Sequence, residues 1–282
     1  MKLERRGFRL DVCIKLGSFL LEGTLLDKVQ CLLCKHAPKW TSMMHVYRYR
    51  EQATPIDAFL PGALTDAVRS RGLERGPLSK ELQRRFPTPP RLLGSAEIRG
   101  AHNSLIVIPS FDEKIVARRG DSWGWGNTIT FQACKPSIDG VHAVIWARRL
   151  FADVCDALSP WYGNAHMGAE FDSKNISHEG GGTRAIGIDV SKYLPGMYWL
   201  NFFGKPYRDL IGRDRLLSAP AYEVVEIDDG ILLAIDADAL AWKSEEYQDK
   251  ERAVLAHLGA EHFFSRDDPG REYVAPDFLP LC

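Results

Sequence analysis

Hydrophobic and polar residues alternate over residues 8–16, close to the amino end of the chain. A period of two is typical of a strand with one apolar and one polar face. Over 24–36 the apolar residues change to helical spacing, and Thr24 followed by Asp27 suits the first turn of a helix. A second strand is predicted at 43–50, so the amino end is β-α-β, or β-α with an antiparallel return.

The pattern weakens over residues 51–99, where six prolines interrupt it. We interpret this part as an irregular connecting region with short helical pieces near 64–71 and 79–86, because proline removes a backbone donor and fixes φ. Beyond it, apolar runs predict strands at 105–108 and 127–134. An apolar stripe at helical spacing then predicts a long helix over 139–158, which Pro160 ends.

The carboxyl-terminal third has clearer boundaries than the middle. An Asp-Asp-Gly sequence, Asp228 to Gly230, favours a tight turn between two short apolar runs. Gly259 is typical of the residue that follows a helix. The elements predicted here are a strand at 161–171, a helix at 205–217, a hairpin of 221–227 and 231–235, and a helix at 245–258.

Helices and hairpins in this order predict the α+β class, with antiparallel or mixed sheets packed by helices, rather than a doubly wound parallel fold. Two similar α/β lobes are an alternative form of this arrangement. We divide the chain into residues 1–137, an amino-terminal α/β lobe that contains the proline-rich segment 51–99, and residues 138–282, a carboxyl-terminal α+β lobe. The two are expected to form one compact unit.

Charge is distributed unevenly along the 282 residues, although the formal net charge is only -1. Residues 1–100 contain 18 Lys and Arg against 10 Asp and Glu, whereas residues 201–282 contain 9 against 17. The acidic end would suit a basic protein partner, although a solvated surface is the simpler interpretation. The carboxylates that form the candidate partner-binding surface are Asp228, Asp229, Asp236, Asp238, Glu245 and Glu246.

No apolar stretch is long enough for a membrane span or a signal peptide, so we expect a cytoplasmic protein. Six cysteines in a chain of this length do not indicate a disulfide framework, and we expect them to be reduced and mostly buried. Cys31 and Cys34 with His36 resemble part of a zinc site, but a second ligand pair is missing. The sequence predicts no metal site and no cofactor.

Signals for catalysis are weak. The loop 175–184 contains three glycines beside His178 and Glu179, which could act as an acid and a base. It lacks the lysine of a phosphate-binding loop, and no nucleophile stands in a recognisable motif. Four aromatic residues could stack on bases, but packing is the simpler role without a basic stripe around them. They are Trp123, Trp125, Trp161 and Tyr162. We predict that the protein is not an enzyme and does not bind nucleic acid directly.

Residues 196–220 contain an aromatic YWxNFFG pattern followed by a helix, "LIG", "RLL" and Ala-Pro. A hairpin, the run 231–236 and "HLG" before Phe263 and Phe264 complete the motif. This part of the chain resembles immunity protein family 52 of bacterial polymorphic-toxin and type VI secretion loci. The resemblance implies a cytoplasmic protein that neutralises a co-encoded toxin stoichiometrically, with a basic nuclease domain as the expected partner. It carries over no catalytic residues.

Two other function classes remain open at this stage. A hydrolase or transferase acting through His178 predicts a deep polar pocket that gathers this histidine with other titratable groups. A general protein-interaction module predicts exposed surface without any link to a toxin. The immunity hypothesis predicts an exposed acidic or aromatic surface, which we place at residues 228–246, and a toxin gene immediately upstream.

Overall fold

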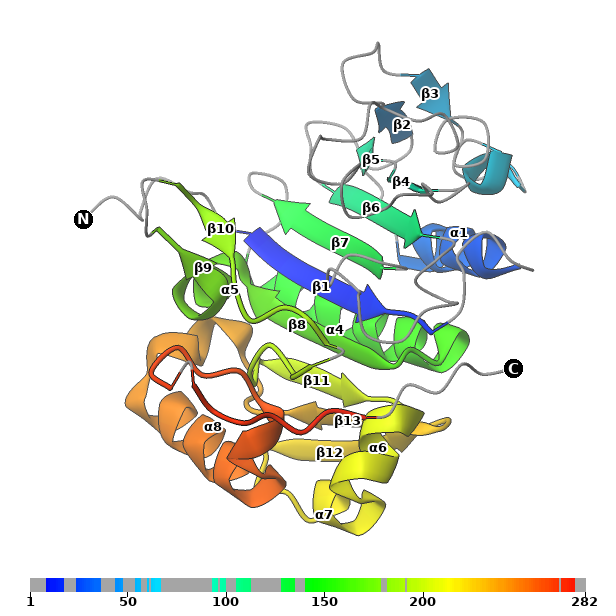
Figure 1. Cartoon of the computed structure of the whole chain (residues 1–282). Helices are drawn as coiled ribbons and strands as arrows, with labels where there is room; N and C mark the ends of the chain where they lie inside the picture. The colour runs from blue at the N-terminus through cyan, green and yellow to red at the C-terminus, as the bar shows by residue number, and fades with distance from the viewer. Residues whose placement is uncertain are drawn as a thin grey trace, which may run out of the picture.

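The computed structural model confirms an α+β fold in the residues it describes, which are 9–17, 24–36, 44–47, 54–56, 60, 62–66, 93–95, 97–99, 105–112, 128–134, 140–178, 182–190, 192–268 and 270–276. Its main feature is one antiparallel sheet, with helices on its faces (Figure 1). None of the helices in the described part of the chain combines the length and apolar character that crossing a membrane requires.

The described strands of the main sheet number eleven, in the order β12-β13-β11-β8-β1-β7-β6-β5-β2-β3, with β4 paired to β6. A separate small ladder joins β9 (Ile176–Ser177) to β10 (Arg184–Ala185). The main-sheet strands are β1 (Arg9–Lys15), β2 (Met44–Tyr47), β3 (Thr54–Ile56), β4 (Leu93–Ser95), β5 (Glu97–Arg99), β6 (Leu105–Asp112), β7 (Thr128–Cys134), β8 (Tyr162–Met167), β11 (Leu200–Phe203), β12 (Glu223–Ile227) and β13 (Gly230–Ala234).

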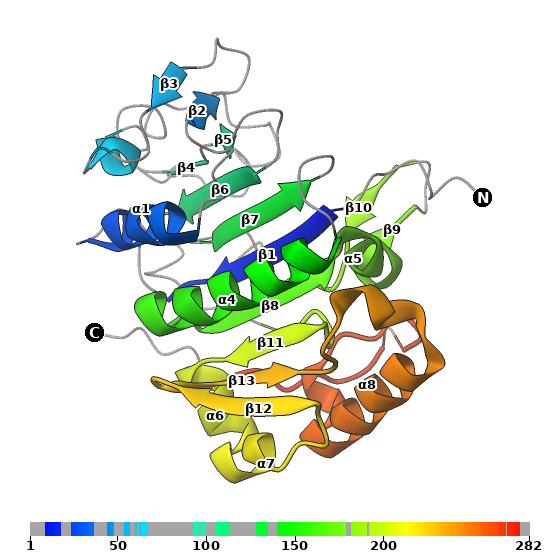
Figure 2. The same ribbon diagram turned by 180° about the vertical axis from the view of Figure 1, so that it is seen from behind.

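Strand β1 lies between β7 and β8, so the sheet continues across the sequence boundary at 137/138. Leu10, Val12 and Ile14 are fully buried on the face covered by α1 (Leu25–His36) and α4 (Gly140–Leu158). Figure 2 shows these two helices in front of the sheet. Alternation therefore predicted this strand and its apolar face correctly.

The other face of the sheet carries a second core, formed with α6 (Lys205–Ile211), α7 (Arg213–Leu217) and α8 (Glu245–Leu258). Most large side chains of the aromatic motif are buried, with Trp199 and Phe203 fully enclosed. The last residue of the motif, Gly204, has no room for a side chain, because a Cβ there would lie 1.8 Å from the Pro160 carbonyl oxygen. The motif that carries the family resemblance is thus mainly core packing.

Two predicted elements were wrong in part. The strand expected at 161–171 ends at Met167, and α5 (Gly168–Asn175) follows it directly. The helix expected at 205–217 divides at Gly212, whose φ of 99° does not continue a helix. The helix at 245–258 is observed as α8, with Ser244 accepting a hydrogen bond from the Tyr247 N–H group.

The proline-rich segment 51–99 is described only in short pieces. Besides β3, β4 and β5 they include a helical turn over 62–66, which overlaps the start of the helical piece predicted near 64–71. The helix predicted at 79–86 lies outside the described residues. Two 3-10 helices, η5 (Ala239–Lys243) and η6 (Ala260–His262), flank α8.

Candidate functional site

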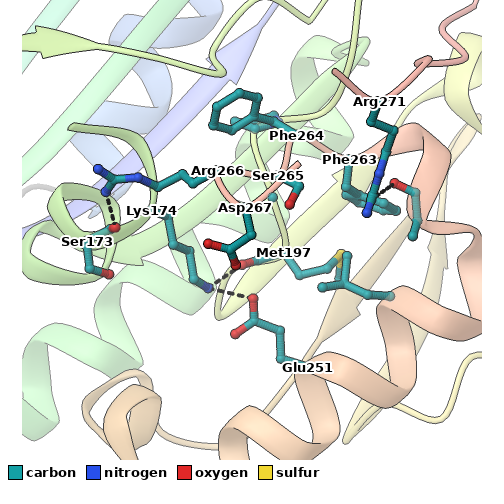
Figure 3. A pocket seen from close by; sticks show the side chains of 14 residues that line it. Ser173, Lys174, Met197, Glu251, Phe263, Phe264, Ser265, Arg266, Asp267 and Arg271 are labelled. Atoms are coloured by element: carbon teal, nitrogen blue, oxygen red, sulfur yellow. Dashed lines mark hydrogen bonds and ion pairs between the residues drawn. The ribbon is translucent and has the colours of Figure 1, made fainter. Parts of the chain in front are cut away.

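An open pocket of about 510 Å³ lies between α5, α8, η6 and the segment that follows η6 (Figure 3). Its walls combine apolar side chains with charged ones, and none of its lining residues is a histidine or a cysteine. The lining residues are Ser173, Lys174, Pro195, Gly196, Met197, Glu251, Leu255, Ala260, Phe263, Phe264, Ser265, Arg266, Asp267 and Arg271.

Lys174 is the central charged group of this pocket, and its ammonium group is surrounded by acceptors. Nζ lies 2.8 Å from Glu251 Oε1, 2.9 Å from Glu170 Oε1 and 2.6 Å from the Met197 carbonyl oxygen. The ring of Tyr198 lies beneath it, with Nζ 5.1 Å from the ring centroid. Three acceptors and a ring face fix the position of the ammonium group.

Glu170 is the buried partner of Lys174, and its side chain has no solvent exposure. Burial raises the pKa of Glu170, and Lys174 opposes this rise by stabilising the charged carboxylate. Tyr247 donates a 3.1 Å hydrogen bond to the same oxygen, Oε1, that Lys174 contacts. The second oxygen, Oε2, has no hydrogen-bond partner, so the carboxylate depends on Lys174 for compensation of its charge.

The rim of the pocket is held by two arginines that bind backbone carbonyl groups. Arg266 donates to the Ser173 carbonyl oxygen at 2.7 Å, and Arg271 donates to that of Ala260 at 3.0 Å. These bonds join α5 and η6 to the segment after Phe264 (Figure 3). The pocket can accept a group with apolar and charged parts.

A second cluster of reactive residue types lies on the polar face of β1 and β8, where Asp11 and His166 are buried and Cys13 is partly buried. Cys13 Sγ lies 3.9 Å from His166 Nε2, and Asp11 Oδ2 lies 3.9 Å from His166 Nδ1. Burial raises the pKa of Cys13 to about 12 and lowers that of His166 to about 3. A cysteine nucleophile works as a thiolate beside an imidazolium, whereas this environment favours both neutral forms.

The structure divides the six candidate carboxylates between the two ends of β13. Asp228 and Asp229 form the exposed turn before it, and Asp228 adopts a φ of 48°. Asp228 Oδ2 accepts a 2.6 Å hydrogen bond from Ser159, and Asp229 lies 3.5 Å from Arg208 Nη1. We call Asp228 and Asp229 the hairpin pair.

The other four carboxylates lie after β13, on the approach to α8 and its first turn. Asp236 and Glu246 share Lys250, at 3.0 Å and 2.9 Å. Partial burial acts to raise the pKa of Asp236, but the contact with Lys250 and backbone hydrogen bonds outweigh it and lower the pKa. Asp238 caps η5 by accepting from the Leu240 N–H group, and Glu245 is exposed in the first turn of α8. The acidic surface expected at 228–246 is therefore two separate groups.

The remaining candidates are dispersed. His178 is exposed, with Nδ1 3.2 Å from Thr183 Oγ1, and it does not line the pocket, while Glu179 lies outside the described residues. Tyr162 is buried in the second core, as the packing interpretation expected, and Trp161 is partly buried. Trp123 and Trp125 lie outside the described residues.

Cys31 and Cys34 are both exposed on α1, which contradicts the expectation of mostly buried cysteines. The buried stripe of α1 is formed instead by leucines and Val29, so the two thiols occupy its outer side. No group of three or more potential His, Cys, Asp or Glu ligands is found in the described residues.

The sequence interpretation missed the pocket and its Glu170–Lys174 pair. Glu170 lies in the segment 161–171 that was predicted as a strand, and Lys174 lies just beyond its end. Glutamate and lysine four positions apart, in this order, are a recognised helix-stabilising pair, and this was the available signal. The contribution of Glu251, from a distant helix, could not be inferred from spacing.

No protein-family model and no curated protein sequence matches the chain. Among solved structures, its fold is similar to that of the Pseudomonas aeruginosa T6SS protein PA0821, with a TM-score of 0.51. The match covers 96% of this chain and 80% of that chain, at 12% sequence identity. At this identity the similarity shows a shared fold, and the resemblance to immunity protein family 52 rests on the sequence motif alone.

Proposed function

We propose that this protein is a cytoplasmic immunity protein that binds a co-encoded toxin and neutralises it stoichiometrically. The observation that carries the proposal is the fold shared with a T6SS protein over almost the whole chain. The motif of residues 196–264 points to the same biological setting. The proposed partner is a basic nuclease domain, because the carboxyl-terminal third of the chain is acidic.

The geometry of the described titratable groups supports binding rather than turnover. Lys174 and Glu170 are committed to each other, and Cys13 and His166 are held in their neutral forms. Exposed carboxylates are available at both ends of β13. Such groups can accelerate association with a basic protein through long-range attraction.

The test is reconstitution with the toxin encoded immediately upstream. The purified pair should form a complex of equal stoichiometry in moderate salt, measured by light scattering after size-exclusion chromatography. The complex should also suppress the toxin's activity in proportion to the amount of immunity protein added. A toxin that remains fully active beside an equimolar amount of the folded protein would contradict the proposal.

Reversing the charge of the hairpin pair and of Glu245 and Glu246 should slow association with the toxin by about tenfold at low salt. The reason is that electrostatic steering acts mainly on the association rate and weakens with ionic strength. Stopped-flow measurements over a salt series would provide the rates, and the salt dependence should become shallower.

Because the two acidic groups lie at opposite ends of β13, each should be reversed separately as well as together. A suitable control for either twofold variant reverses two exposed carboxylates at other sites, Asp66 and Asp156. Association rates that remain equal to wild type in the fourfold variant would remove residues 228–246 from the toxin-facing surface.

A further inference from the structure

Strand β12 is an edge of the main sheet. It pairs with β13 on one side, and no strand in the described part of the chain pairs with its other side. An edge strand presents unpaired backbone N–H and C=O groups, which can accept a strand from another chain. β12 contains no proline, and its five residues are all exposed or partly exposed.

The face of β12 that approaches α4 has exposed apolar side chains next to this open edge. Arg148 of α4 forms an ion pair with Glu223, and its guanidinium lies 6.0 Å from the ring centroid of Tyr222. Tyr222 is 54% exposed, and Val225, two positions beyond Glu223 on the same face, is 40% exposed. Ile145, one helical turn before Arg148, is also exposed.

The charge along this edge is acidic. Residues 222–229 include four carboxylates and no Lys or Arg. Glu223 is paired with Arg148, Glu226 with Arg213, and Asp229 with Arg208, all at exposed or partly exposed positions. The turn carboxylate Asp228 has a hydroxyl partner rather than a cation, so negative charge is left for a partner to neutralise.

This charge decides which kind of chain could pair with β12. A second copy paired antiparallel would bring the carboxylates of one β12 close to those of the other. Like charges on facing strands are destabilising, whereas opposite charges contribute to cross-strand pairing. The edge therefore favours a basic extended segment over self-association.

We propose that β12 docks an extended segment of a basic partner protein as an added strand, with an apolar side chain of that segment on Tyr222 and Val225. Under the proposed function, on which this inference rests, the segment belongs to the toxin. Main-chain hydrogen bonds would supply affinity, and the carboxylates of β12 and its turn would select for basic residues.

The test compares toxin binding by three variants at exposed valines. Val225→Arg should weaken binding by at least tenfold, because it removes the apolar contact and adds a positive charge that repels the basic segment of the partner. Val225→Glu should weaken binding less than Val225→Arg, since it keeps the attraction to basic residues. Val274→Arg is the matched control, with a similar exposure of 43% on a different segment, and should bind as wild type does.

Hydrogen exchange of the wild-type complex provides a second measurement, in which the backbone amides of β12 should be protected on toxin binding. If wild type binds the toxin but Val225→Arg binds equally well and β12 gains no protection, strand docking is wrong and the proposed function stands. If wild type does not bind the toxin, both fail. A dimer of the free protein that Val225→Arg dissociates would also overturn the inference.

Discussion

Replacing Lys174 by methionine is expected to lower the free energy of unfolding by about 3–5 kcal/mol at neutral pH. The methionine keeps the aliphatic stem but removes the ammonium group that contacts both Glu170 and Glu251. Glu170 is fully buried, and its second oxygen already has no partner, so its charge would be left uncompensated. Urea denaturation of wild type and variant measures the difference directly.

Three comparisons separate this effect from a general loss of packing. Lys192→Met removes an exposed ion pair with Asp189 and should cost less than about 1 kcal/mol. Adding Glu170→Gln to Lys174→Met should recover part of the loss. The loss should also shrink in acid, because burial raises the pKa of Glu170 and the carboxyl takes up a proton. A loss below 1 kcal/mol for Lys174→Met would show that the pair does not stabilise the fold.

Elements with strong local patterns were predictable from the sequence. The alternating β1, the amphipathic α4 and the capped α8 are observed close to their predicted bounds. In each case the signal depends on residues within the element itself, through periodicity or a capping side chain. The antiparallel hairpin of β12 and β13 is similar, because its turn sequence lies between the two strands.

Features that depend on distant neighbours were not predictable. Alternation in β1 indicated a polar face in contact with solvent, yet Asp11 is 3% exposed because β1 is a central strand covered on both faces. The acidic residues 228–246 are neighbours in sequence, but β13 places them at its two ends. Helix α5 was missed because it is short and polar, and because it follows β8 directly, with no turn residues to mark the boundary.

Lowering the pH is expected to destabilise the protein through His166, and His166→Gln should remove this effect. The ring is 2% exposed and stacks near Phe171 and Tyr198, with centroids 5.1 Å and 4.8 Å away. Burial lowers the pKa of His166 from 6.5 to about 3. Between these values the unfolded chain binds a proton that the folded protein does not, so stability falls as the pH falls from 6.5 towards 3.

Asp11, beside His166, acts in the opposite direction. Burial raises its pKa from 3.8 to about 6, although Arg9 acts to lower it. Between these pH values the folded protein binds a proton that the unfolded chain does not, so stability rises as the pH falls from 6 towards 3.8. The two effects partly cancel between pH 6 and 4. In wild type we therefore expect a shallow pH dependence from this pair, which hides a large contribution from His166.

His166→Gln should expose that hidden contribution. Relative to wild type, the variant should gain about 3 kcal/mol in unfolding free energy between pH 7 and pH 4, whatever its cost at pH 7. Urea titrations at several pH values would measure this change, with His178→Gln as the control at an exposed histidine. If the difference in unfolding free energy between His166→Gln and wild type stays constant from pH 7 to pH 4, burial does not lower the pKa of the His166 ring. The polar face of β1 and β8 would then have to be more accessible to water than its burial indicates.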